Sequence, residues 1–129
     1  PTPEAICEHV RQRLGFQLVA EFQRDDGTVP LIQLAPEWEE TFSTYQIEGD
    51  KGRRDVALPP DVFNTLTEAV GEEIRRAAEN GITPAIVTST HRRRFLRTAL
   101  SAKHINTPVL SFEEIGIDTR PALVGVVAA

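Results

Sequence analysis

The alternation of apolar and polar residues is clearest between positions 84 and 112, where it predicts a strand, a helix and a second strand. A short run rich in β-branched residues at 85–87 leads into Thr88, Ser89 and Thr90, whose hydroxyl groups suit the start of a helix. Apolar residues with helical spacing and a second apolar run at 109–112 follow. Strands joined through a helix are usually parallel, with a right-handed crossover, so we expect one βαβ unit here.

Helical spacing of apolar residues predicts three more helices. In residues 4–23 an apolar residue recurs every four positions, and Gly15 predicts a kink or a junction between two helices. A short helix is expected over 36–45 and the longest helix over 58–80. The short helix carries an aromatic stripe that should face the core, formed by Trp38, Phe42 and Tyr45.

Two further apolar runs, 29–34 and 122–127, predict a first and a last strand. The charged, glycine-containing stretch 48–55 has no apolar periodicity and is expected to be a mobile loop. Four strands separated by helices predict an α/β fold with an open, mostly parallel sheet flanked by helices. A turn near Gly27 should separate a helical arm, 1–27, from a C-terminal α/β subdomain, 28–129.

Composition narrows the class of protein. The chain has 129 residues, 40% of them hydrophobic, which is enough for one compact domain with a helical appendage. Its net charge of −5 disfavours binding to nucleic acid or to an anionic membrane surface. One cysteine excludes an internal disulfide, and no apolar run approaches the roughly 18 residues of a membrane span. Because the chain contains no methionine, we expect it to be part of a larger protein.

The segment 88–94, Thr-Ser-Thr-His-Arg-Arg-Arg, is the most suggestive chemical feature. Strand carboxyl ends and helix N-termini bind anions, so one interpretation is an anion site formed by Ser89, Thr90, Arg92 and Arg93. Three arginines in a first helical turn oppose the helix dipole, however, and need compensation. A small anion, an acidic partner protein or glutamates of the same chain could supply it. The nucleotide motifs GxxxxGK[ST] and GxGxxG are both missing from the sequence.

The sequence does not contain a pattern typical of a catalytic site or of a metal site. Ser89 and His91 are too close along one helix start to face each other as nucleophile and base, and no GxSxG motif is present. The three histidines and the one cysteine do not have the spacing of zinc ligands. We therefore expect no catalytic residue, no metal and no cofactor.

Several segments together resemble the C-terminal end of the large membrane subunit of type III protein export gates, the FlhA/LcrD/InvA-type family. The most specific is residues 107–115, Thr-Pro-Val-Leu-Ser-Phe-Glu-Glu-Ile. Three further segments strengthen the resemblance: residues 84–88, the arginine-containing helix 92–100 and the closing residues 124–127. The stretch 8–18 is similar to a helix of that family. The runs 88–94 and 113–118 favour the flagellar branch. The resemblance covers essentially the whole chain.

This resemblance implies a non-enzymatic part of an inner-membrane protein, lying on the cytoplasmic side and joined to the membrane only through a missing N-terminal half. It implies partners of two kinds: copies of the same protein in a ring, understood as a nonamer, and the soluble flagellar export apparatus with its ATPase complex and chaperone–cargo complexes.

The candidate partner-binding residues are the charged groups of the central unit, Arg92, Arg93, Arg94, Glu113 and Glu114. We expect the three arginines to form a polar contact surface, so that replacing them with glutamate leaves the fold intact but impairs export. For Glu113 and Glu114 the alternative is that they cap a turn or pair with the arginines.

Overall fold

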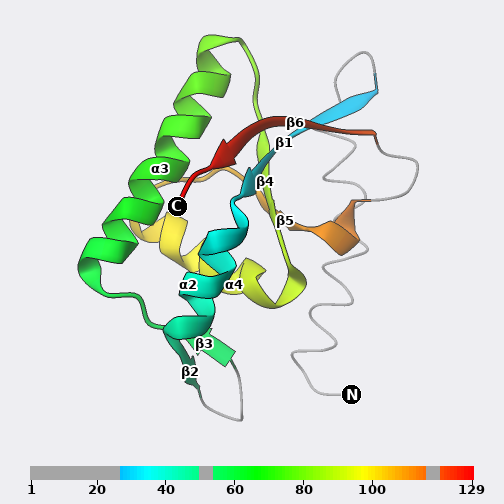
Figure 1. Cartoon of the computed structure of the whole chain (residues 1–129). Helices are drawn as coiled ribbons and strands as arrows, with labels where there is room; N and C mark the ends of the chain where they lie inside the picture. Colours follow the sequence, from blue (N-terminus) through cyan, green and yellow to red (C-terminus); the bar gives the residue numbers. More distant parts are fainter. Residues whose placement is uncertain (1–26, 50–53, 116–119) are drawn as a thin grey trace.

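The computed structural model describes residues 27–49, 54–115 and 120–129. The predicted arm 4–23, and with it the predicted break at Gly15, lies outside the described residues. The elements in chain order are β1 (Thr28–Leu34), α2 (Pro36–Thr44), β2 (Gln46–Glu48), β3 (Arg54–Val56), α3 (Pro60–Glu79), β4 (Ala85–Thr88), α4 (Thr90–Ala102), β5 (Val109–Ser111), the 3-10 turn η2 (Phe112–Glu114) and β6 (Arg120–Val127) (Figure 1). No helix among the described residues is long and apolar enough to cross a membrane.

The main sheet has four strands in the order β5-β4-β1-β6, and all neighbouring pairs are parallel. β1 occupies the middle, with Ile32 beside Ile86 of β4. Its pairing with β6 shifts by one residue after Leu31, which leaves Val124 as the extra residue of a bulge. The predicted α/β fold with an open parallel sheet is confirmed.

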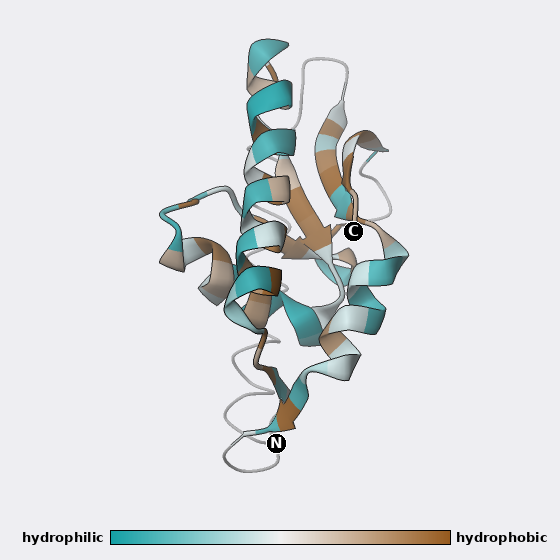
Figure 2. Cartoon of the chain, turned by 60° about the vertical axis from the view of Figure 1, so that its left-hand side comes forward, coloured by the Kyte–Doolittle hydropathy of each residue, from teal (hydrophilic) through white to brown (hydrophobic). Residues whose placement is uncertain are grey.

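One face of the sheet forms the main core with helices α2, α3 and α4. Strand residues such as Ile32, Ile86 and Val109 pack there against side chains from each helix: Trp38 and Phe42, Leu66 and Val70, and Leu96 and Leu100. Figure 2 shows the hydrophobic colour gathered on the strands, while the outward surface of α3 is largely hydrophilic. That pattern is the amphipathicity from which α3 was predicted. A second cluster of apolar strand residues, which includes Leu31 and Leu110, faces away from these helices.

The aromatic stripe of α2 is only partly as predicted. Trp38 and Phe42 are buried, with ring centroids 6.0 Å apart, and Phe42 meets Phe95 of α4 edge-on at 5.1 Å. Tyr45 instead ends the helix as its C-terminal capping residue and is partly exposed.

One prediction about an irregular segment was wrong at its ends, and another was wrong outright. The stretch 48–55 was expected to be a loop, but its two ends belong to β2 and β3, which pair antiparallel from Gln46↔Val56 to Glu48↔Arg54. Residues 50–53 lie outside the described residues. Each strand has three residues and all of β2 is exposed, so no alternating pattern could mark it. Phe112 was expected in a strand but lies in η2, 48% exposed, because Ser111 and Glu114 form a capping box that turns the chain.

Candidate functional site

Helix α4 starts at the carboxyl end of β4, and its first turn concentrates positive charge. Ser89 is the N-terminal capping residue, yet its side chain makes no capping hydrogen bond, and the first turn contains no acidic residue. Arg92 and Arg93 therefore stand near the positive end of the helix dipole, which disfavours them. The structure places three glutamates from two other elements around this turn.

Glu39 of α2 neutralises Arg92. The guanidinium lies with Nη2 2.8 Å and Nε 3.0 Å from Oε1 of Glu39, and Nη2 also donates to the Ser43 hydroxyl at 3.2 Å. Arg92 is only 3% exposed, whereas the Glu39 side chain is 49% exposed. Nε2 of His91 lies 3.6 Å from the same Oε1. A buried arginine with a bidentate carboxylate partner fixes the start of α4 against α2.

The two glutamates of η2 complete the arrangement. The Thr90 hydroxyl donates a hydrogen bond to Oε2 of Glu113, and this bond is the main reason that the pKa of Glu113 lies below its ordinary value. Glu114 is fully buried, and its Oε1 accepts from the Ser111 N–H at 3.0 Å and from the Ser111 hydroxyl at 3.1 Å. Nε of Arg93 lies 3.8 Å from that same oxygen.

The five predicted partner-binding residues therefore differ in exposure. Arg94 and Glu113 are exposed, and the Arg93 side chain is 15% exposed. The expected contact surface of three arginines is wrong at Arg92, which is buried in its ion pair with Glu39. Glu114 is buried as well, and its capping box and its closeness to Arg93 agree with the alternative that it caps a turn or pairs with the arginines. Replacing all three arginines by glutamate would place new carboxylates beside Glu39 and Glu114, so that change cannot be neutral for the fold. Partner binding by Arg94 and Glu113 stays a prediction.

The alternative anion site loses most of its donors to these glutamates. Thr90 donates to Glu113, Arg92 donates to Glu39, and Arg93 forms an ion pair with Glu114. Among the four, Ser89 is the member with neither a side-chain hydrogen bond nor an ion pair in the described chain. Of the compensations considered from sequence, carboxylates of the same chain are the ones observed.

Sequence reasoning missed Glu39. The signal was present, since α2 follows β1 directly and has acidic residues in its first turn. Connecting it with Arg92 required the knowledge that β1 and β4 are neighbours, whose carboxyl ends meet at one edge of the sheet.

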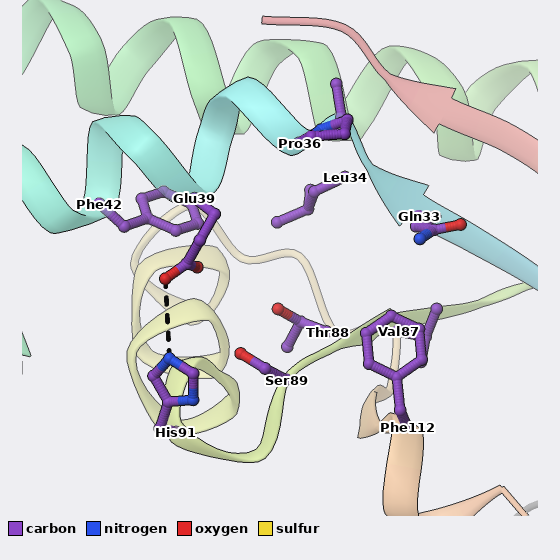
Figure 3. Close-up of a pocket in the computed structure, with 11 residues that line it drawn as sticks. Gln33, Leu34, Pro36, Glu39, Phe42, Val87, Thr88, Ser89, His91 and Phe112 are labelled. Carbon is purple, nitrogen blue, oxygen red and sulfur yellow. Dashed lines mark ion pairs between the residues drawn. The ribbon is translucent and has the colours of Figure 1, made fainter.

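A cavity of about 350 Å³ opens beside this charged cluster, at the carboxyl ends of β1 and β4. Its apolar lining includes Leu34, Phe42 and Val87. Figure 3 shows the Thr88 and Ser89 hydroxyl groups at the cavity, between the Glu39–His91 pair on one side and Phe112 on the other. The cavity thus combines an apolar lining with hydroxyl, imidazole and carboxylate groups. Across the described residues no group of three or more potential ligand side chains could hold a metal ion.

Comparison with known proteins gives the family. The model of the FHIPEP family matches residues 1–120. The chain belongs to the FHIPEP family. It is 34% identical over 122 residues to the flagellar biosynthesis protein FlhA of Caulobacter vibrioides, covering 95% of this chain and 17% of that protein. It is 28% identical over 120 residues to protein hrpC2 of Xanthomonas euvesicatoria, covering 93% of this chain and 18% of the relative. The family resemblance seen in the sequence is confirmed, and the chain spans less than a fifth of these relatives.

Solved structures of similar fold support the architecture. The nonameric SctV-C of EPEC superposes with a TM-score of 0.79 at 17% identity, covering 95% of this chain and 36% of that one. The MxiA protein of Shigella flexneri gives a TM-score of 0.77 at 18% identity, covering 98% of this chain and 39% of that one. At these identities the similarity establishes the fold.

Proposed function

We propose that this chain is the C-terminal cytoplasmic subdomain of a flagellar type III protein export gate. It acts without catalysis, supporting ring assembly and the docking of export components while flagellar proteins cross the inner membrane. The observation that carries this proposal is membership of the FHIPEP family together with 34% identity to a flagellar biosynthesis protein over nearly the whole chain.

Two solved structures of similar fold motivate the proposed partners. One is the nonameric EscV cytosolic domain from the type III secretion system, and the other is a complex of the Chlamydia pneumoniae CdsV and CdsO proteins. By analogy, the full-length protein that contains this chain forms a homo-oligomeric ring at the inner membrane. The ring receives soluble export components, among them the ATPase complex and chaperone–cargo complexes, on its cytoplasmic side.

The charge arrangement favours a protein partner over a small anion or nucleic acid. Arg92 and Arg93 are already close to glutamates of the same chain, and the chain as a whole carries a net charge of −5. Arg94 of α4 and Glu113 of η2 are exposed and carry opposite charges. Such mixed charge is typical of the polar rim of a protein interface.

The test is a charge reversal at Arg94 in the intact gate protein, because its exposure allows the change without loss of the fold. Arg94→Glu should reduce flagellar protein export and recovery of soluble export components with the gate protein. Lys103→Glu, an exposed basic residue at the other end of α4, is the matched control. Normal export and normal recovery in the Arg94→Glu strain would contradict docking at this turn. Loss of both in the Lys103→Glu strain would show that the effect is not specific to it.

A further inference from the structure

We propose that the cavity at the carboxyl ends of β1 and β4 binds an extended peptide segment of a partner protein. The peptide would insert one aliphatic side chain and form hydrogen bonds through its backbone amide groups. This inference rests on the proposed docking function and names the site on this domain that performs it.

The first argument is shape and polarity. The cavity measures about 350 Å³ and its lining includes Leu34, Phe42 and Val87. This volume lies at the small end of the range for ligand pockets, so it suits one branched side chain better than a cofactor. Phe112, which also lines the cavity, is 48% exposed, a large apolar surface that a bound segment would cover.

The second argument is a hydroxyl group without a hydrogen-bond partner. Thr88 lines the cavity and is only 7% exposed, yet its side chain has no hydrogen-bond partner within the described ranges. The Ser89 hydroxyl beside it does not cap α4 either. A hydroxyl group that no other side chain or backbone group engages is available for a hydrogen bond with a ligand. In Figure 3 both side chains lie at the cavity, where a bound carbonyl oxygen or N–H group could meet them.

The third argument is charge. The start of α4 offers backbone N–H groups and a positive dipole end, which alone would favour an anion. The Glu39 carboxylate lines the same cavity and opposes an anion, while Arg92, bound to Glu39, opposes a cation. A neutral ligand that carries both acceptors and donors satisfies this arrangement. A peptide group, with one C=O and one N–H, is such a ligand.

A titration of the 129-residue chain, followed by backbone amide NMR, tests the chemistry directly. The probe is N-acetyl-leucine N-methylamide, with N-acetylglycine N-methylamide to remove the side chain. Two further probes, 4-methylpentanoate and 3-methylbutylammonium, keep a branched apolar group but carry a negative or a positive charge. We expect saturable shifts of the Thr88, Ser89 and His91 amides with the leucine probe. Affinity for the glycine probe should be at least about tenfold lower, because several buried carbon atoms are lost.

Thr88→Val is the decisive variant, because valine keeps the shape and the strand preference of threonine and removes the hydroxyl. It should weaken binding of the leucine probe about three- to tenfold without lowering the melting temperature. Thr98→Val, at an exposed position of α4 that does not line this cavity, is the control and should bind as the wild type does. The proposal is overturned if Thr88→Val binds normally, if the charged probes bind more tightly, or if the shifts map elsewhere. It is also overturned if the cavity amides shift with protein concentration alone, because the occupant would then be a second copy.

The same variant separates this inference from the proposed function. If Thr88→Val in the intact protein loses probe binding but retains export and recovery of soluble export components, the cavity is not the docking site and the inference fails while the function stands. If the wild-type protein recovers no export component although the probe binds as expected, the proposed function fails. Reduced export together with reduced probe binding supports both.

Discussion

The contact between α2 and α4 provides a quantitative test of how this domain holds its charged helix start. The ion pair is asymmetric, because Arg92 is 3% exposed and Glu39 is 49% exposed. Removing Glu39 leaves a buried guanidinium without its carboxylate, whereas removing Arg92 leaves a carboxylate that water can solvate. We therefore expect Glu39→Ala to destabilise the domain more than Arg92→Met.

The expected magnitudes follow from this difference in exposure. Loss of one partner of a fully buried ion pair costs about 3–5 kcal/mol, and hydrogen bonds to charged groups contribute about 1.5–3 kcal/mol. Because Glu39 is half in water, we expect about 2–3 kcal/mol for Glu39→Ala. For Arg92→Met we expect about 1 kcal/mol, since methionine replaces much of the buried stem. In the double variant the two losses should not add, giving a coupling energy of about 1–2 kcal/mol.

Urea unfolding of the four proteins of this cycle measures the coupling, with the single tryptophan as reporter. Trp38 lies on α2, is 3% exposed and donates through Nε1 to the Ala128 carbonyl oxygen at 3.1 Å, so its fluorescence should change on unfolding. The control cycle uses Glu72 and Arg75 of α3, whose side chains are 45% and 56% exposed. That exposed pair should couple much more weakly, because water and salt screen its charges. Additive losses at Glu39 and Arg92, or a larger cost for Arg92→Met, would refute the reasoning.

The remaining predictions concern pH and backbone conformation. The hydrogen bond from Thr90 holds the pKa of Glu113 in the folded protein below its ordinary value. This contact therefore stabilises the fold at pH values above the pKa of Glu113 in the unfolded chain. The stabilisation is lost as the pH falls through the lower pKa of the folded protein. Thr90→Val should therefore lower the free energy of unfolding at neutral pH and have less effect under acid conditions; an equal effect at both would contradict the assignment. Gly81 has φ +71° after α3, so Gly81→Ala should cost about 1 kcal/mol in urea unfolding. Gly71 lies inside α3 with open space at its Cβ position, so Gly71→Ala should raise the free energy of unfolding by about 0.5–1 kcal/mol. A stabilising Gly81→Ala or a destabilising Gly71→Ala would count against the helix boundaries.

The sequence predicted those elements whose side chains repeat with one clear period. The strand at 85–87 and the helix after it were recognisable because β-branched residues and a helical stripe follow each other directly. The hairpin of β2 and β3 was not, since strands of only three residues, with all of β2 exposed, give no clear alternation. The turn at η2 carried a signal that apolar content obscured: Ser111 and Glu114 have capping-box spacing, and they redirect the chain before Phe112 can extend the strand.

The site was predictable in composition but not in geometry. The three arginines indicated that negative charge must lie near the start of α4, and the structure supplies it from Glu39, Glu113 and Glu114. Their positions depend on strand order and on the turn after β5, which local patterns do not encode. The same limitation explains why Arg92 was expected to be exposed, since burial of an arginine requires a partner that only the fold brings near.

The most direct test of the central claim, that this turn docks a protein and does not hold a small anion, is an amide NMR titration of the chain in two stages. The first stage adds phosphate and nucleotides, and the second adds purified soluble components of the flagellar export apparatus. The account predicts no saturable shifts from the anions and clear shifts around Arg94, Glu113 and the Thr88–Ser89 cavity from at least one export component. Saturable phosphate shifts at Ser89 and Thr90, with no response to any export component, would contradict it.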